Sequence, residues 1–198
     1  YIVTSAGVMH EQTFGEVFNE SYVVSGGVEN IPVMEESDRK RIGARALAEI
    51  RPGDIVNLGI GLPESVASVA AETGRFSEFT LTIESGPVGG VPASGLNFGC
   101  SAFPEAIIDQ PSQFDFYDGG GIDVAVLGAV EIDPQGSVNV ASLGGRFAGV
   151  GGFVNIATSA KRLVFTCTFR AGQHAKFVSQ RKGFAHIVSN ANNGFTNL

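Results

Sequence analysis

The sequence contains few of the residues that build disulfide or metal sites. Its two cysteines, Cys100 and Cys167, stand in no spacing typical of metal ligands, so neither a disulfide scaffold nor a structural zinc site is predicted. This cysteine usage fits a reducing compartment. The three histidines lie toward the two ends of the chain, outside the strands predicted below, which disfavours Ser-His-Asp catalysis.

Positive charge and long apolar runs are also scarce. The 13 Lys and Arg residues are outnumbered by 20 Asp and Glu, which gives a net charge of -7 at pH 7. We therefore expect no nucleic-acid partner, because nonspecific binding depends on Lys and Arg at the phosphates. Apolar runs such as 124–130 are far shorter than the roughly 20 residues of a membrane helix, and no secretory signal is visible. We expect a cytoplasmic protein without a membrane span.

Helix and strand patterns alternate along the rest of the chain, whose 43% hydrophobic residues suit a globular protein. Apolar residues at helical spacing follow Ser37, and further helices are predicted from Pro63 and near 104–109. Nearly continuous apolar runs predict buried strands at 54–58, 79–84, 122–127 and 163–169. Such strands are typical of parallel sheets. The predicted fold is an open, mainly parallel α/β sheet with helices on both faces.

Glu84 closes the apolar run 79–83, and a segment rich in Gly and Pro follows at once. A carboxylate in this position lies at the rim of a sheet, where reactions commonly take place. Glu84 is therefore a candidate nucleophile. The alternative is a solvated carboxylate at the end of a strand.

Two glycine-rich segments are candidates for close contact with a ligand. The segment Gly59–Glu64 begins like a dinucleotide fingerprint, but Glu64 occupies the position that needs Gly or Ala, which disfavours NAD. It is either a tight turn with positive φ or a place where the backbone approaches an acyl or phosphate group. The segment 144–152 is either a flexible surface loop or a set of N–H groups that faces an oxyanion.

Three motifs, in this order and spacing, resemble family I coenzyme A transferases. They are VNLGIGLPE at Val56–Glu64, TIESG at Thr82–Gly86 and GVGGFVNI at Gly149–Ile156, and DFYDGGGID at Asp115–Asp123 and VLGA at Val126–Ala129 also fit the pattern. The resemblance spans roughly 12–172. It is strongest to the single-chain propionate or acetate type, which carries ESG around the catalytic glutamate, whereas the succinyl-CoA:3-oxoacid branch typically carries ENG.

The resemblance implies a ping-pong transfer of coenzyme A between a short-chain acyl-CoA and a carboxylic acid, through a covalent glutamyl-CoA thioester on Glu84. It implies no metal and no redox cofactor. By the same resemblance the backbone N–H of Gly152, with Gly151 beside it, contacts the thioester oxygen, and Gly59 and Gly61 shape the pocket floor. The implied set of CoA- and acyl-binding residues also includes Asn57, Gly149 and Val150.

The resemblance covers only the second, beta-type half of these enzymes. We therefore expect residues 1–36 to be a connector, 37–189 to be the catalytic domain and 190–198 to be a disordered tail. The expected partners are the N-terminal, alpha-type half and further copies of the chain in a homo-oligomer. Two alternatives stay open: an acyl-CoA hydrolase that uses the same glutamate, and a non-catalytic domain that keeps the fold.

Overall fold

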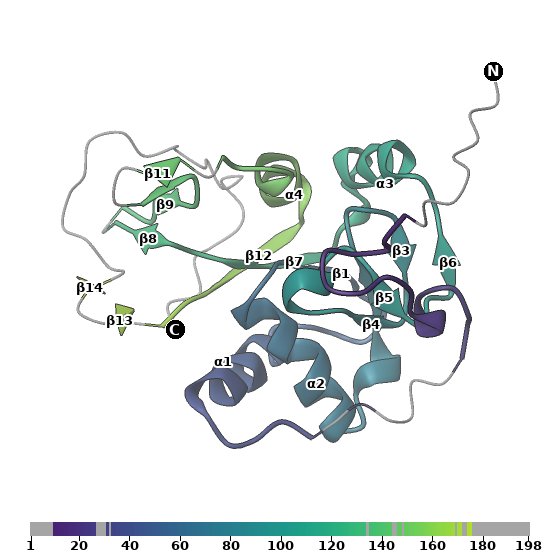
Figure 1. Cartoon of the computed structure of the whole chain (residues 1–198). Helices are drawn as coiled ribbons and strands as arrows, with labels where there is room; N and C mark the ends of the chain where they lie inside the picture. The colour runs from purple at the N-terminus through teal and green to yellow at the C-terminus, as the bar shows by residue number, and fades with distance from the viewer. Residues whose placement is uncertain are drawn as a thin grey trace.

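The computed structural model describes residues 10–26, 31, 33–133, 135–143, 146–147, 149–168, 170–171 and 174–175. These residues form a central six-stranded sheet (Figure 1). Its strands are, in spatial order, β12 (Arg162–Thr166), β7 (Val124–Gly128), β1 (Ile55–Leu58), β2 (Thr80–Thr82), β3 (Pro87–Val88) and β6 (Ala106–Ile107). The first four are mutually parallel; β3 pairs antiparallel with β2, and β6 pairs antiparallel with β3. The prediction of a mainly parallel sheet is confirmed.

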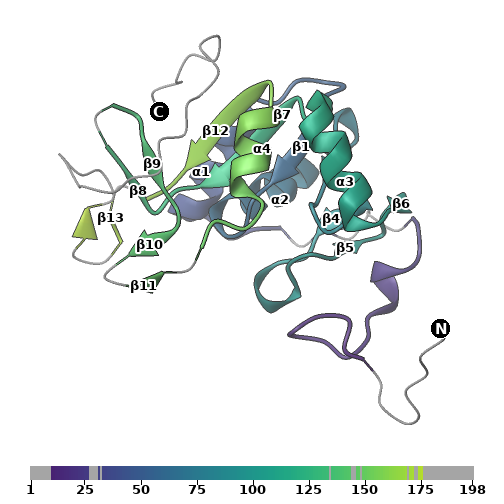
Figure 2. The same cartoon turned by 90° about the horizontal axis from the view of Figure 1, so that it is seen from above.

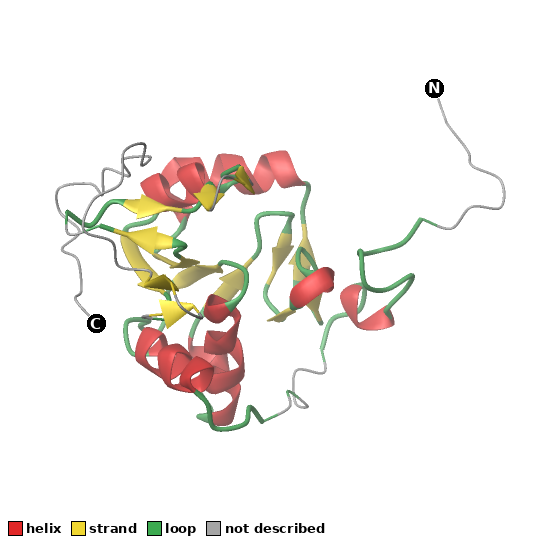
Figure 3. Cartoon of the chain, turned by 60° about the vertical axis from the view of Figure 1, so that its left-hand side comes forward, coloured by secondary structure: helices red, strands yellow, loops and turns green. Residues whose placement is uncertain are grey.

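Helices cover both faces of this sheet, as predicted. Helices α1 (Asp38–Leu47) and α2 (Ser65–Glu72) lie on one face, and α3 (Gln110–Phe116) and α4 (Phe153–Ser159) lie on the other (Figures 1 and 3). Figure 2 shows α3 and α4 side by side over the strands. Helix α1 begins where its sequence predicts, because the Ser37 side chain accepts a hydrogen bond from the Lys40 N–H.

Strand β7 shows why the sheet needs helices on both sides. Its residues Val124 and Val126 pack in a cluster with α1 and α2, whereas Ala125 and Leu127 pack in a second cluster with α4. Successive side chains of a strand point to opposite faces, so an uninterrupted apolar run can be buried only between two layers. The continuous apolar runs in the sequence therefore indicate an arrangement of three layers, in which the sheet lies between two layers of helices.

The N-terminal ends of the central strands are held together by charged side chains. Arg162 at the start of β12 pairs with Asp54, just before β1, and also donates to the carbonyl of Glu49. Asp123, just before β7, accepts from the N–H of Ile55 at 2.9 Å and pairs with Lys161 at 2.8 Å. This edge of the sheet is closed by polar contacts, which leaves the opposite edge, at the C-terminal strand ends, for a ligand.

Some predicted boundaries are wrong. No helix forms at 104–109: residues Ala106–Ile107 are strand β6, and helix α3 begins only after Asp109, whose side chain caps it by accepting from the Ser112 N–H. A proline, Pro111, lies in the first turn of α3, where it is tolerated. The strand predicted at 79–84 ends at Thr82, so Glu84 lies in the turn beyond it. The strand predicted at 163–169 is Arg162–Thr166.

Short antiparallel pairs that the sequence did not predict complete the fold. They are β4 (Val91–Pro92) with β5 (Ser101–Ala102), β8 (Glu131–Ile132) with β9 (Val138–Asn139), β10 (Ser142–Leu143) with β11 (Arg146–Phe147), and β13 (Arg170–Ala171) with β14 (His174–Ala175). Strands of two residues carry no readable alternation. Their pairing is set by contacts between segments, not by local pattern.

The predicted connector packs on one of these hairpins over its described part. A single turn of 3-10 helix, Glu20–Tyr22, contacts β5, and the Phe103 N–H donates to the carbonyl of Ser21 at 2.6 Å. Thr13 donates to the side chain of Asn97 at 2.6 Å. The predicted tail at 190–198 lies outside the described residues. In the described part of the chain, no helix combines the length and the apolar content that crossing a membrane requires.

Gly86 gives a test of the turn that carries Glu84. Its φ is +130°, and a Cβ atom there would lie 1.9 Å from the carbonyl oxygen of Ile108. Gly53 also has a positive φ, +85°, but a Cβ there would meet no atom within 4 Å. We expect Gly53→Ala to cost about 1–2 kcal/mol of backbone strain and Gly86→Ala to cost clearly more, because a backbone atom must also move.

Urea denaturation of both variants measures this difference in the free energy of unfolding. Equal losses for the two variants would show that the Ile108 contact adds nothing to the backbone term.

Candidate functional site

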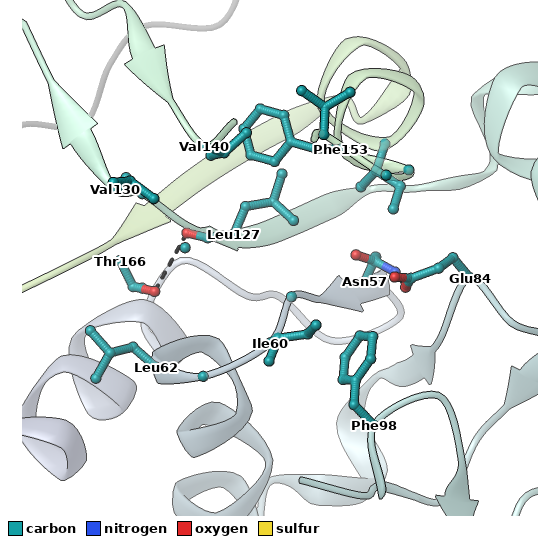
Figure 4. Close-up of a pocket in the computed structure, with 18 of the residues that line it drawn as sticks. Asn57, Ile60, Leu62, Glu84, Phe98, Leu127, Val130, Val140, Phe153 and Thr166 are labelled. Atoms are coloured by element: carbon teal, nitrogen blue, oxygen red, sulfur yellow. Dashed lines mark hydrogen bonds between the residues drawn. The ribbon is translucent and has the colours of Figure 1, made fainter. Parts of the chain in front are cut away.

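A cavity of about 540 Å³ opens at the C-terminal ends of the parallel strands (Figure 4). Its wall includes every residue of the predicted site: Asn57, Gly59, Gly61, Glu84, Gly149, Val150, Gly151 and Gly152. These residues come from three segments that are far apart in the sequence. They meet because the C-terminal ends of the parallel strands β1, β2 and β7 lie at one edge of the sheet.

Glu84 lies in the tight turn between β2 and β3. The N–H of Gly86 donates to the carbonyl of Ile83 at 3.0 Å, and this contact closes the turn around Glu84 and Ser85. The Glu84 side chain is half-buried at one end of the cavity. Burial raises the pKa of its carboxyl group, although hydrogen bonds from its own N–H and from Asn57 act in the opposite direction. A carboxylate with little solvation is well suited to act as a nucleophile.

Asn57 lies in the middle strand, β1, and is completely buried. Its Nδ2 atom is 3.4 Å from Glu84 Oε2, 3.4 Å from the carbonyl oxygen of Thr82 and 3.3 Å from the hydroxyl oxygen of Tyr117. Figure 4 shows the amide group directed at the Glu84 carboxylate. Asn57 therefore contacts the candidate nucleophile from strand β1 of the central sheet.

The glycines of the cavity serve different structural needs. Gly61 has a φ of +89°, and Gly149 and Gly151 have φ values of +82° and +53°, conformations that other residues rarely adopt. Gly59 has no such φ; a Cβ there would lie 3.3 Å from the side chain of Leu127. At Gly152 a Cβ would lie 2.7 Å from the ring of Phe114. Gly61 thus has the positive φ that the tight-turn interpretation expects, whereas a side chain at Gly59 or Gly152 would crowd Leu127 or Phe114.

The turn Gly149–Gly152 leads directly into helix α4. Gly152 is the N-cap residue, and its carbonyl accepts from the Ile156 N–H at 3.0 Å. Among the described residues, the N–H groups of Gly151 and Gly152 donate to no acceptor. Both residues line the cavity, so this turn can offer two donors to an oxygen atom bound there.

Sequence reasoning missed several residues around the site. The remaining wall is mainly apolar: Ile60, Leu62, Phe98, Leu127, Gly128, Ala129, Val130, Val140, Phe153, Ile156 and Thr166. Behind Asn57, the buried side chains of Thr82, Gln113 and Tyr117 form a hydrogen-bonded group. Tyr117 lies in the motif at 115–123, which fitted the family pattern but was not assigned to the site. Gln113 stands outside the quoted motifs and gave no signal.

Within the described ranges, no group of three His, Cys, Asp or Glu side chains is placed to hold a metal ion. His10 is exposed, and Cys100 and Cys167 do not line the cavity. The polar side chains of the cavity wall are Asn57, Glu84 and Thr166. This set offers one carboxylate and hydrogen-bonding groups around an apolar space, which suits covalent chemistry on an uncharged group.

Comparisons with known proteins point to one family. The sequence model described as "Coenzyme A transferase" matches residues 40–169. Caffeate CoA-transferase of Acetobacterium woodii is 49% identical over 146 residues, which cover 71% of this chain and 28% of the relative. Acetate CoA-transferase subunit beta of Escherichia coli (strain K12) is 34% identical over 136 residues, which cover 64% of this chain and 62% of the relative.

A solved structure adds the match in three dimensions. The acyl-CoA transferase YdiF of Escherichia coli O157:H7, in a crystal structure described as a thioester complex with CoA, has a TM-score of 0.68 and 33% identity to this chain. The match covers 79% of this chain and 33% of YdiF, so this chain spans only part of the length of the relatives it matches. Because the family model covers well over half of the sequence, the chain belongs to the coenzyme A transferase family, as a beta-type half of the family I kind.

Proposed function

We propose that this chain is the catalytic half of a short-chain acyl-CoA:carboxylate CoA-transferase, with Glu84 as its nucleophile. The observation that carries the proposal is the position of Glu84, half-buried at the end of an apolar cavity that also contains two unpaired N–H donors among its described residues. The names of the relatives, caffeate and acetate CoA-transferase, support the reaction class. The description of the YdiF structure as a thioester complex with CoA supports the covalent step.

The reaction would proceed in two symmetrical halves. A Glu84 carboxylate oxygen attacks the thioester carbonyl carbon, the carbon–sulfur bond breaks, and CoA leaves as a thiolate. The thiolate then attacks the Glu84 carbonyl carbon of the resulting acyl-glutamyl anhydride and displaces the acid as a carboxylate. A second carboxylate reverses these steps and leaves with the CoA. These steps need no redox change and no external proton. They therefore fit our expectation that the reaction uses no metal and no redox cofactor, with CoA entering as part of the substrate.

Each attack passes through a tetrahedral oxyanion, and we propose that the N–H groups of Gly151 and Gly152 stabilise it. We assign Gly152 the closer contact. Donors of this kind act strongly in a cavity with apolar walls, because water does not screen them. Gly59 and Gly61 form the nearby floor, and Gly149 and Val150 form part of the same wall. Asn57 would hold the Glu84 carboxylate for attack.

We further propose that an alpha-type half completes the site. The relative named as a subunit beta supports this pairing. Two apolar residues of the cavity wall are strongly exposed, Ile60 at 58% and Val150 at 38%, and a partner half would cover them. The hydrolase alternative gains no support, because the relatives are named as transferases.

The first test is labelling of Glu84. The chain, with an alpha-type half supplied, is incubated with acetyl-CoA or propionyl-CoA and then reduced with borohydride, which converts a glutamyl thioester to an alcohol. We expect mass spectrometry to find this change at Glu84. Glu84→Gln should reduce CoA exchange by at least about a thousandfold, because it removes the nucleophile.

The control is Glu36→Gln, which neutralises an exposed carboxylate outside the cavity and should leave exchange intact. Exchange by Glu84→Gln at the rate of the unaltered chain would exclude Glu84 as the nucleophile. An unlabelled Glu84 together with full activity would do the same.

The raised pKa of Glu84 also predicts a pH-dependent effect on stability. Burial raises this pKa in the folded chain above its value in the unfolded chain. Between the two values the folded chain holds the proton more tightly, so the free energy of unfolding falls as the pH rises through that window. Glu84→Gln removes this loss. We expect the variant to be more stable than the unaltered chain at neutral pH, with the gain vanishing below about pH 4, where glutamate is protonated in both states.

Thermal denaturation at several pH values measures this gain, with Glu35→Gln as the control for removal of a charge, because Glu35 is exposed whereas Glu36 pairs with Lys40 at 3.1 Å. The quantity to compare is the stability of Glu84→Gln minus that of the unaltered chain. If this difference is smaller at neutral pH than at acid pH, the burial argument is wrong.

A further inference from the structure

A buried group of polar side chains lies behind Glu84. Asn57 on β1, Thr82 on β2, and Gln113 and Tyr117 from α3 and its end are all almost completely buried. The Tyr117 hydroxyl oxygen is the common point: it is 2.9 Å from Thr82 Oγ1, 2.9 Å from Gln113 Nε2 and 3.3 Å from Asn57 Nδ2. Of these side chains, only Asn57 reaches Glu84.

The directions of these hydrogen bonds follow from a backbone carbonyl. Thr82 Oγ1 lies 3.1 Å from the carbonyl oxygen of Val56, which can only accept, so the Thr82 hydroxyl hydrogen is used there. Thr82 Oγ1 must then accept from Tyr117, and this contact uses the only Tyr117 hydroxyl hydrogen. The Tyr117 oxygen is left as an acceptor. Its neighbours Asn57 and Gln113 must therefore present N–H groups to it.

This sequence of bonds determines which way the Asn57 amide faces. The amide nitrogen and oxygen have nearly the same shape, so only their hydrogen-bonding partners distinguish the two orientations. Asn57 Oδ1 has no hydrogen-bond partner in the described part of the chain. The surroundings of Oδ1 therefore favour neither orientation of the amide. The orientation is set where Nδ2 lies, by Tyr117 and by the Thr82 carbonyl.

We propose that Tyr117 and Thr82 are positioning residues, which act through Asn57 to keep an N–H donor, and not a carbonyl oxygen, against the Glu84 carboxylate. A flipped amide would place Oδ1 against the carboxylate and the Thr82 carbonyl, and both would repel it. The geometric inference concerns this chain alone. Its catalytic meaning rests on the proposed role of Glu84.

The charge balance around Glu84 agrees with this geometry. Burial raises the Glu84 pKa, and the Asn57 amide is the side chain that lowers it. Tyr117 is the titratable neighbour: burial raises its pKa, and the charge of Glu84 raises it further, so its hydroxyl stays protonated and can donate to Thr82. Loss of the correctly oriented amide would remove a stabilising donor from the carboxylate and raise the Glu84 pKa.

The test is a carboxyl titration that needs no partner and no turnover. The full chain is labelled with ¹³C at the glutamate carboxyl carbons, and the signal of Glu84 is assigned by its loss in Glu84→Gln. Thr82→Val keeps the shape of the side chain but removes the hydroxyl, so the Tyr117 hydrogen becomes free to turn toward Asn57, where Nδ2 now lies. A flipped amide, with Oδ1 in that position, would then be able to accept it. We expect Thr82→Val and Tyr117→Phe to titrate Glu84 at a higher pH than the unaltered chain.

Two matched variants separate positioning from packing. Thr82→Ser keeps the hydroxyl and should restore the titration of the unaltered chain. Tyr22→Phe removes a buried tyrosine hydroxyl that donates to Glu16 at 2.8 Å, outside the cavity, and should leave Glu84 unchanged. The Thr82 pair decides the question even if Tyr117→Phe fails to fold. The proposal is overturned if Glu84 titrates at the same pH in Thr82→Val as in the unaltered chain. It is also overturned if Thr82→Ser shifts the Glu84 titration as much as Thr82→Val does.

Activity gives the second measurement. With an alpha-type half supplied, kcat of Thr82→Val should fall with KM little changed, by about 10- to 100-fold, the range that orienting partners contribute at metal sites. The acid limb of its pH profile should move to higher pH. If Glu84 is never labelled in the unaltered chain while the titrations behave as expected, the proposed function fails and the positioning of Asn57 stands. If Glu84 is labelled in the unaltered chain but Thr82→Val does not shift its titration, the proposed function stands and the positioning of Asn57 fails.

Discussion

The register of strand β1 is the constraint on which the rest of the structure depends. In this register Asn57 pairs with Thr82 on one side and with Ala125 on the other. Its neighbours Val56 and Leu58 point into the apolar cluster under α1 and α2, so Asn57 points to the opposite face, toward Tyr117. A slip by one residue would reverse every side chain of the strand. It would bury the amide among aliphatic residues and remove the contact with Glu84.

The same register brings the strand ends together. Charged pairs fasten the N-terminal edge of the sheet, where Arg162 meets Asp54 and Lys161 meets Asp123. The glycine turns therefore gather at the other edge, with Glu84 beside them. Apolar walls keep water from the carboxylate, which both raises its pKa and strengthens any hydrogen bond made in the cavity. The burial that raises the pKa of the Glu84 carboxyl group also makes its charged form costly to the fold.

The polar group behind Glu84 extends this compromise into the core. The Tyr117 hydroxyl donates to Thr82 and accepts from both Asn57 and Gln113. The side-chain oxygens of Asn57 and Gln113, however, have no hydrogen-bond partner within the described residues. An apolar core would avoid this cost. Proteins tolerate such local inconsistencies at functional sites, where stability is exchanged for a defined arrangement of donors. The position of these side chains directly behind the candidate nucleophile fits that rule.

Local pattern in the sequence was sufficient to predict the main elements and to single out Glu84 as a candidate nucleophile. Continuous apolar runs determined the parallel strands and the two covering layers, and Ser37 determined the start of α1. Three short motifs in order, one of them around Glu84, indicated the family. Each of these signals lies within a few neighbouring residues. The hairpins and the start of α3 after Asp109 were not predictable, since they depend on pairing between distant segments. Only the tertiary structure decided that Tyr117 and Thr82 lie behind Asn57, and that a side chain at Gly152 would crowd the ring of Phe114. Those contacts join residues far apart in the chain, and spacing along a sequence carries no information about the direction in which a hydrogen bond points.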